Sequence, residues 1–332
     1  MPKLTRAITL QKISAPISDD LRAFRKFFRE ALRNDNLLLD TALRYIIRRK
    51  GKQIRPILVL LSAAAAGGIS RRTHIGATLV ELLHTATLVH DDVVDEAAER
   101  RGLPSLNSIW NNKTAVLVGD YMLAQGLRIA NQNREYGFLE MTSEAVQRMS
   151  RGELMQTKKT MKLDISEEEY FRIISDKTAS LISACCTIGG SSASDSATVV
   201  NGLHAYGEAV GIAFQIRDDL FDYVSTERSI GKPIGNDLQE KKLTLPLIHA
   251  LAAAPRKESK RVLSIIRSGS KGGPSIIADV QGFVRDQGGV AYAERMADSF
   301  KNKAIDALAP LNDSPARESL IAFAEYVVQR TA

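Results

Sequence analysis

The sequence has few of the groups that covalent and redox catalysis require. Its 332 residues contain five histidines and only two cysteines, the neighbours Cys185 and Cys186. Adjacent residues on a helix point in different directions, so these two thiols predict no disulfide and are typical of a reduced, cytoplasmic protein. No Ser-His-Asp or Cys-His arrangement is suggested by the sequence. We therefore expect chemistry that uses no side-chain nucleophile.

Long apolar runs and nucleic-acid signatures are also missing. Nowhere do eighteen apolar residues follow one another, and the N-terminus lacks an apolar core of signal-peptide length. The net charge is +7, but aromatic residues make up only 6% and the basic residues are scattered along the chain. The sequence predicts no transmembrane segment and no nucleic-acid partner, and its positive charge fits small anionic substrates better.

Helical spacing dominates the chain, whereas the alternating pattern of strands is nearly absent. Hydrophobic residues make up 44% of the sequence, enough for a large core, and no repeat of 20 to 50 residues is visible. The pattern predicts an all-α fold, a single-domain bundle over residues 1–332 of long antiparallel helices around a central cavity. The expected helices include 37–50, 79–95, 107–133, 136–160, 166–188 and 195–224, with a loop at 225–237.

A tight acidic cluster ends the expected helix that begins at Leu79. Asp91 and Asp95 are four residues apart and lie on one face, with Asp92 beside them. Like charges at this spacing repel, and the C-terminal end of a helix is already negative. A compensating cation is needed, and gathered carboxylate oxygens suit Mg²⁺.

A second cluster, Asp218, Asp219 and Asp222, repeats this spacing behind another apolar run. Basic residues accompany the acids: Arg100 and Arg101 follow the first cluster, and guanidinium groups match phosphate oxygens. The segment 51–56, GKQIRP, places two cations three residues apart at a helix start. The combination predicts a site that binds a metal ion together with phosphate groups.

These motifs resemble those of the all-trans prenyl diphosphate synthases, over roughly residues 52–249. The resemblance implies that the six aspartates act through Mg²⁺ on an allylic diphosphate, and that the protein is a homodimer through helices of its first half. It implies that the allylic diphosphate is assisted by Arg100, Lys177, Thr178, Gln215, Lys232 and Lys242. It implies that isopentenyl diphosphate is held by Lys52, Arg55, His84 and Arg101. His84 lies two turns before Asp91, on the same face.

The sequence departs from the family at one position. The family usually has Glu-Gly-Lys before the Leu-Thr-Leu-Pro run, whereas here Lys241 replaces the glycine. The sequence therefore leaves open whether Lys241 or Lys242 contacts a diphosphate.

The expected reaction follows from the metal-phosphate constellation. A diphosphate neutralised by Mg²⁺ is a good leaving group, and departure from an allylic carbon leaves a delocalised carbocation that an apolar interior shields from water. Catalysis would come mainly from charge stabilisation and placement. At most, peripheral membrane contact is expected for product release.

Product length is predicted from the same helix as the first cluster. Ala86 and Thr87 precede Asp91 by five and four residues, about one turn deeper along the acid-bearing face. Short-chain family members tend to have an aromatic residue there, whereas small side chains leave a tunnel open. We therefore expect a long all-trans product, heptaprenyl or octaprenyl. Residues such as Met122, Leu123 or Met155 would form the tunnel floor.

Four other functions remain open from the residues alone. A class I terpene cyclase shares the ionisation step but needs one diphosphate site, and a short-chain farnesyl or geranylgeranyl diphosphate synthase differs only in product. A non-catalytic partner subunit is expected to lose acids, and none is lost here. A basic surface-binding protein would not need six aspartates.

Overall fold

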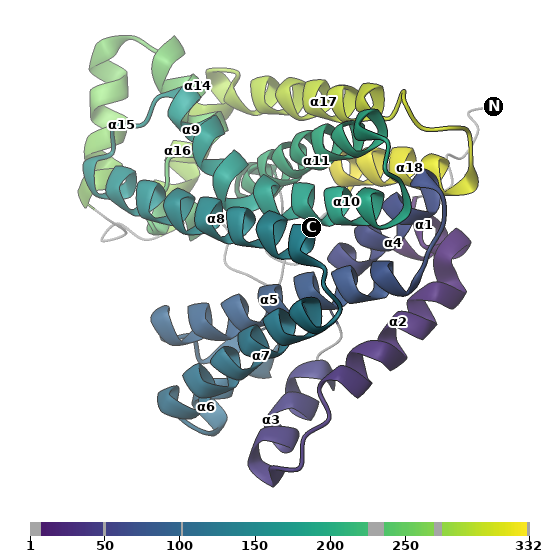
Figure 1. The fold of residues 1–332 in the computed structure, drawn as a ribbon. Helices are drawn as coiled ribbons and strands as arrows, with labels where there is room; N and C mark the ends of the chain where they lie inside the picture. Colours follow the sequence, from purple (N-terminus) through teal and green to yellow (C-terminus); the bar gives the residue numbers. More distant parts are fainter. Residues whose placement is uncertain (1–7, 49–50, 101, 225–235, 269–273, 331–332) are drawn as a thin grey trace, which may run out of the picture. The chain divides into compact units, whose positions relative to one another are not determined.

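The computed structural model describes residues 8–48, 51–100, 102–224, 236–268 and 274–330, and these are helical nearly throughout (Figure 1). The predicted all-α class is confirmed. The first helices are α1 (Leu10–Ile13), η1 (Ala15–Ile17), α2 (Ser18–Ala31), α3 (Leu37–Arg48), α4 (Ile54–Ala66), α5 (Arg71–Val94), α6 (Leu106–Ile109) and α7 (Asn112–Gln132). The middle helices are α8 (Tyr136–Lys162), α9 (Glu167–Ile174), η2 (Ser175–Ala179), α10 (Ser180–Ala193) and α11 (Ala197–Val224). The last helices are α13 (Asn236–Gln239), α14 (Leu245–Ala253), α15 (Arg256–Ser268), α16 (Pro274–Asp286), α17 (Gly289–Ala307) and α18 (Pro315–Gln329).

The chain divides into two compact units whose segments alternate along the sequence. Unit 1 contains residues 1–143, 184–203 and 310–320, and unit 2 contains residues 144–183, 204–309 and 321–332. Each unit is described by itself below. The single domain that the sequence predicts over 1–332 stays a prediction.

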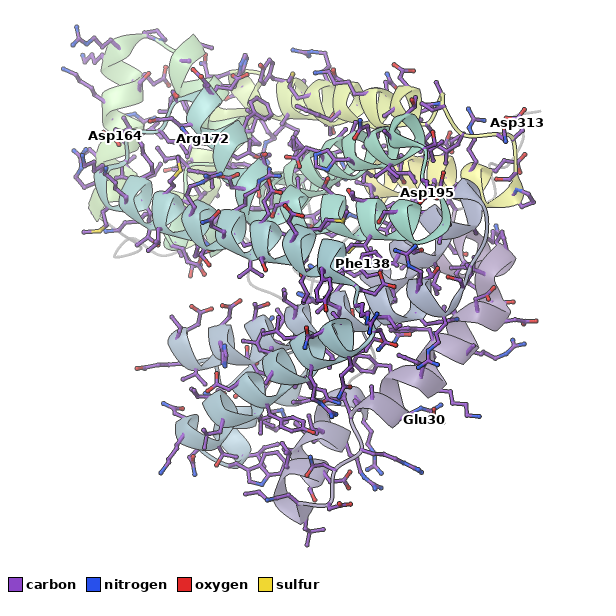
Figure 2. All side chains as sticks on the ribbon, in the orientation of Figure 1. Glu30, Phe138, Asp164, Arg172, Asp195 and Asp313 are labelled. Atoms are coloured by element: carbon purple, nitrogen blue, oxygen red, sulfur yellow. The ribbon has the colours of Figure 1, made fainter. Side chains whose placement is uncertain are left out.

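Unit 1 is organised around α5, which packs along α7 and against α4 and α2. Ser70 and Thr73 form a capping box at the start of α5, which satisfies backbone groups that a helix end leaves open. Phe138, in the first turn of α8 (Figure 2), is 2% exposed. The Arg72 guanidinium lies over its ring, 5.5 Å from the ring centroid. Arg72 also donates to Glu135, at 2.8 Å. These contacts fix the helix that carries the first acidic cluster.

Unit 2 has α14 packed against α9, α16 and α17. Tyr170, Ile216 and Leu245 belong to one buried cluster, and Tyr223 and Leu247 belong to a second. Burying side chains of this size supplies the main driving force for folding. The helix that carries the second group of aspartates contributes to both clusters, with Ile216 in the first and Tyr223 in the second.

Several expected helices differ locally from the structure. The helix expected over 107–133 is interrupted between α6 and α7, where Asn111 has a φ of 145° and its side chain caps α7 by accepting from the Thr114 amide at 2.8 Å. The helix expected over 166–188 contains a π turn, η2, and continues to Ala193. Asn236 and Asp237 open α13, although the sequence favours a loop there.

Strands are confined, among the residues that the structure describes, to one short antiparallel pair, β1 (Glu99–Arg100) and β2 (Leu103–Pro104). Over the same described ranges, no helix has both the length and the apolar content that crossing a bilayer requires.

Candidate active site

The first acidic cluster lies at the C-terminal end of α5. Asp91 and Asp92 are in the last turn, and Asp95 is the C-cap, with its amide donating to the Asp91 carbonyl at 2.8 Å. Asp92 is buried, and its Oδ1 accepts from Arg100 Nε at 2.5 Å, whereas Asp91 and Asp95 are exposed. The cluster therefore contains one carboxylate held by an arginine and two that solvent or a ligand can reach.

The segment after α5 is folded back so that Arg100 reaches the cluster. The Ala97 amide donates to the Asp92 carbonyl at 2.9 Å, and Ser105 Oγ donates to the Ala97 carbonyl at 2.6 Å. Arg101, the second predicted arginine, lies outside the described residues.

Three further predicted residues lie in unit 1. Lys52 is exposed, and Arg55 is half-buried in the first turn of α4, after Gln53, whose φ of 49° is left-handed. His84 is half-buried on α5, two turns before Asp91. A helix therefore begins directly after this segment, as the sequence predicts, and the role of the segment toward phosphate stays a prediction.

The second acidic cluster lies in the last turns of α11. Asp219 is buried, 6% exposed, and accepts from Tyr170 Oη at 2.6 Å and from Gln215 Nε2 at 2.8 Å. Thr178 Oγ1 in turn donates to Gln215 Oε1 at 2.7 Å. The predicted Thr178, Gln215 and Asp219 therefore form one continuous chain of hydrogen bonds, which fixes the Gln215 amide.

The other two acids of this cluster have separate partners. Asp218 Oδ1 accepts from Arg330 Nη2 at 2.5 Å, and the Arg330 guanidinium also lies 3.8 Å from the Phe214 ring centroid. Asp222 Oδ2 accepts from the Asp237 amide at 2.7 Å.

A cavity of about 90 Å³ in unit 2 gathers many of the predicted residues. Lys177 lines the cavity, and its Nζ lies 2.6 Å from Gln156 Oε1 and 2.6 Å from Glu153 Oε2. The polar lining consists of Gln156, Lys159, Thr160, Tyr170, Lys177, Thr178, Gln215, Asp219, Asp237, Lys242 and Thr244. Five predicted residues therefore line one cavity. They come from the π turn η2, from α11 and from the segment before α14, and are Lys177, Thr178, Gln215, Asp219 and Lys242. Three lysine ammonium groups and two carboxyl groups therefore line the same small cavity.

Burial raises the pKa of both carboxyl groups in this cavity. Burial, followed by the charge of Asp237, raises the pKa of Asp219 to about 8. Burial and the neighbouring Asp222 likewise raise the pKa of Asp237 to about 6. Buried carboxylates of this kind are destabilised as anions until a positive charge approaches, and their oxygens are the hard donors that Mg²⁺ prefers. The donor set therefore fits the predicted metal.

No three acidic, histidine or cysteine side chains converge as a ready-made metal site among the residues that the structure describes. Mg²⁺ is commonly bound by one or two carboxylates together with substrate phosphates and water, without an all-protein cage. Metal binding by the six aspartates stays a prediction.

The structure distinguishes the two adjacent lysines that the sequence left open. Lys242 lines the cavity and pairs with Glu240, whereas Lys241 Nζ donates to the Arg267 carbonyl at 3.2 Å. Lys241 has a φ of 58°, in the left-handed region that glycine adopts without cost. Of the two lysines, only Lys242 lines the cavity.

Sequence reasoning missed Tyr170, Asp237 and Arg330 and cannot be assessed at Lys232, which lies outside the described residues. Asp237 stands alone in a segment that the sequence favours as a loop, and Arg330 is 112 residues from Asp218. Only its position at the end of the Gly-Pro-rich segment that follows the second cluster could have drawn attention to Asp237.

Comparison with known proteins identifies the family of the chain. The polyprenyl synthetase family model matches residues 36–279. The chain is 36% identical to octaprenyl diphosphate synthase of Escherichia coli K12, over 97% of this chain and 99% of that protein.

Two solved structures share the fold. A decaprenyl diphosphate synthase from Rhodobacter capsulatus superposes with a TM-score of 0.90 at 34% identity, covering 97% of this chain and 99% of that one. A polyprenyl synthase from Caulobacter crescentus, complexed with calcium and isoprenyl diphosphate, gives a TM-score of 0.88 at 28% identity, covering 98% and 99%. The resemblance inferred from the motifs is confirmed, and the chain belongs to the polyprenyl synthetase family of trans-prenyltransferases.

Proposed function

We propose that this protein is a Mg²⁺-dependent polyprenyl diphosphate synthase that condenses isopentenyl diphosphate with an allylic diphosphate. The reaction would proceed by ionisation, condensation and elimination, and would yield a long-chain all-trans product. One observation carries the proposal: Lys177, Thr178, Gln215, Asp219 and Lys242, each implied by the family motifs, line one cavity with mixed charge. Names of relatives, octaprenyl and decaprenyl diphosphate synthases, support the reaction class.

The residues of the cavity divide into binding and shielding groups. Lys177 and Lys242 would bind the diphosphate oxygens of the allylic substrate, and Thr178 and Gln215 would orient them. Mg²⁺, when held by the aspartates, would supply charge neutralisation of the departing diphosphate. The apolar walls would exclude water from the allylic cation; they are Ile165, Ile173, Ile174 and Leu243.

Residues of unit 1 would serve the same reaction. Asp91, Asp92 and Asp95 would contribute the first magnesium ligands, and Arg100 would assist the allylic diphosphate. Asp91 and Asp95 are exposed residues at the end of α5, which supports this role. Lys52, Arg55, His84 and Arg101 would bind isopentenyl diphosphate.

Turnover with defined substrates tests the proposal. Purified protein is incubated with Mg²⁺, isopentenyl diphosphate and farnesyl diphosphate, and the extracted prenyl chains are sized. Heptaprenyl or octaprenyl diphosphate is expected. A cyclic hydrocarbon would indicate a terpene cyclase, a product of twenty carbons or fewer a short-chain synthase, and no elongation a silent subunit or a surface-binding protein.

Magnesium with inorganic pyrophosphate is expected to stabilise the folded protein. A ligand that binds only the folded state adds about 3 kcal/mol at a concentration of 100 times its Kd, which raises the Tm of a chain of this size by several degrees. Thermal unfolding is measured with Mg²⁺ alone, pyrophosphate alone and both. The largest shift is expected with both, because each neutralises the other in the cavity. Equal Tm values in all conditions would contradict the site.

We further propose a homodimer through helices of the first half. Apolar side chains of unit 1 are exposed on α3 and α7, with Leu37 at 82%, Leu117 at 56% and Leu127 at 50%. Exposed apolar groups of this size mark surfaces that other chains cover. Sedimentation velocity is expected to give twice the monomer mass, and Leu117→Glu to shift it toward the monomer. A monomeric wild-type protein would refute the proposal.

The protein would be located in a reducing compartment of the cell. Cys185 and Cys186 are free and buried, which supports a cytoplasmic location. Contact with a membrane would be peripheral and serve release of the lipidic product.

A further inference from the structure

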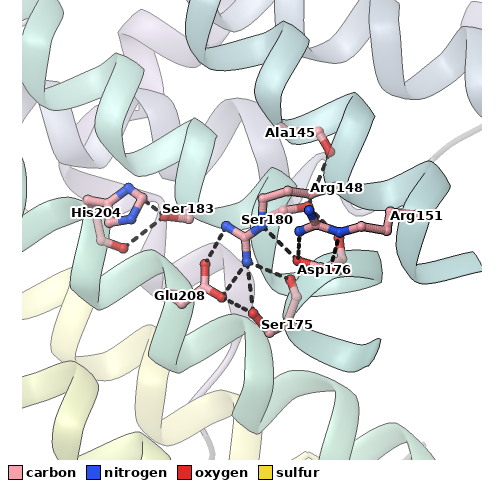
Figure 3. Close-up of polar contacts among 9 residues, drawn as sticks. All are labelled: Ala145, Arg148, Arg151, Ser175, Asp176, Ser180, Ser183, His204 and Glu208. Carbon is pink, nitrogen blue, oxygen red and sulfur yellow. Dashed lines mark hydrogen bonds and ion pairs between the residues drawn. The ribbon is translucent and has the colours of Figure 1, made fainter. Parts of the chain in front are cut away.

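The pair Lys177-Thr178 lies on a helical irregularity. The π turn η2, Ser175–Ala179, separates α9 from α10, and the Ser180 amide donates to the Ser175 carbonyl five residues earlier. Such turns are rare and occur often at functional sites, because the extra residue redirects side chains. Here Asp176 is 3% exposed and faces a cluster of charged residues (Figure 3). Lys177 and Thr178, the next two residues, line the cavity.

That cluster connects three helices of unit 2 through Arg148 of α8. Arg148 Nε donates to Asp176 Oδ1 at 3.0 Å, and its Nη2 donates to Glu208 Oε1 of α11 at 2.8 Å (Figure 3). Its Nη2 also contacts Ser175 Oγ at 2.8 Å, and that hydroxyl donates to Glu208 Oε1 at 2.5 Å. Arg151 adds a two-point contact to Asp176, at 2.9 and 3.0 Å. The cluster therefore holds the first two residues of the π turn from two sides.

The backbone of the π turn is also satisfied by this arrangement. The Asp176 carbonyl accepts from Ser180 Oγ at 2.7 Å, and the Ser175 carbonyl accepts from Arg148 Nη2 at 3.3 Å. At Gly152 of α8, a Cβ would lie 2.8 Å from the Lys177 amide nitrogen. The absence of a side chain there lets α8 approach the turn closely enough for Arg148 to reach it.

Ion pairs of low exposure are weak sources of net stability, because the cost of removing charges from water offsets their attraction. Arg148 and Asp176 have side-chain exposures of 18% and 5%. The main effect of the Arg148–Asp176 contact is geometric, because a planar guanidinium with several fixed acceptors permits few arrangements of the groups around it. Such a cluster beside a π turn is therefore better suited to positioning the residues of the turn than to stabilising the fold.

We propose that Arg148, Asp176 and Glu208 are positioning residues that hold the π turn so that Lys177 and Thr178 both face the allylic diphosphate. This inference rests on the proposed function of the cavity. It assigns to the cluster no contact with substrate.

The test uses Glu208→Gln in the full-length protein, with Glu135→Gln as the matched control. Both changes remove a carboxylate charge from an arginine partner, but Glu135 pairs with Arg72 in unit 1. Glu208→Gln is expected to raise the KM for farnesyl diphosphate at least tenfold, while the KM for isopentenyl diphosphate changes less than twofold. Glu135→Gln is expected to leave both KM values within twofold.

Hydrogen exchange separates failure of the positioning role from failure of the proposed function. Amides of residues 175–180 are expected to exchange at least tenfold faster in Glu208→Gln than in Glu135→Gln. Unchanged exchange, or faster exchange with an unchanged KM for farnesyl diphosphate, would overturn the inference. Lys177→Met is measured in parallel: if it leaves that KM unchanged, the assignment of Lys177 in the proposed function fails, and the inference fails with it.

Discussion

Asp219→Asn is expected to reduce turnover by about 10³-fold while leaving the metal-free protein as stable as the wild type, or more stable. The substitution keeps the size of the side chain. Its one carbonyl oxygen can still accept from Gln215 Nε2, and its amide nitrogen can donate to the hydroxyl oxygen of Tyr170 in place of the present bond. It removes the negative charge that would attract Mg²⁺ in the cavity. Turnover and stability should therefore change independently, which loss of folding cannot produce.

The pH dependence of stability gives a second readout of the same residue. Folded Asp219, with its pKa raised to about 8 by burial and by Asp237, holds a proton that the unfolded chain releases near pH 4. Because the folded state binds more protons across this range, its stability falls as the pH rises from about 4 to about 8. Asp219→Asn should flatten this fall in the metal-free protein. Urea unfolding at pH 5 and pH 8 measures it.

Asp298→Asn provides the matched control. Asp298 is an exposed acid of α17 that pairs with Lys301 at 2.7 Å and takes no part in the cavity. Its replacement is expected to leave turnover within twofold and to leave the pH dependence unchanged. Near-normal turnover in Asp219→Asn would show that this carboxylate is not needed for the reaction.

Local sequence spacing was enough to predict the parts of the site that lie within one helix. Asp91 and Asp95, or Gln215 and Asp219, share a face because the helix repeats every 3.6 residues. The helical spacing of apolar residues before these positions predicts the helices. The absence of the alternating apolar and polar pattern of strands predicts the all-α class. The start of the helix expected from residue 166 is likewise local, because Ser166 and Glu169 form a capping box in which Ser166 Oγ accepts from the Glu169 amide at 3.2 Å.

Contacts between distant segments could not be predicted in this way. Arg330 reaches Asp218 only through the packing of α18, and Arg148 reaches Asp176 and Glu208 only because α8, η2 and α11 meet. The π turn has no sequence signature, because its residues fit an ordinary helix. The left-handed backbone at Lys241 was likewise invisible, since lysine rarely adopts it.

Ala86→Phe is expected to shorten the prenyl product from seven or eight isoprene units to four or fewer. Ala86 is fully buried on α5, the helix that ends in the first acidic cluster, and lies five residues before Asp91. Thr87 Oγ1 donates to the His84 carbonyl at 2.8 Å, so its hydroxyl is folded back onto the helix. If the growing chain passes this level, an aromatic ring there blocks it, while the ionisation chemistry at the aspartates is untouched. Product chains are sized after incubation with Mg²⁺ and both diphosphates.

Overpacking must be separated from blockage, because adding a large side chain to a packed interior costs about 1–3 kcal/mol. Thr87→Phe is the milder variant, since Thr87 is only half-buried. Ala77→Phe is the matched control: Ala77 is fully buried on the same helix, but nine residues, or two and a half turns, from Ala86 and therefore on the opposite side. The control should lose stability without changing product length. If the Ala86 and Thr87 variants keep the wild-type chain length at a measurable rate, the growing chain does not pass along this face of α5, and length is set elsewhere in the protein.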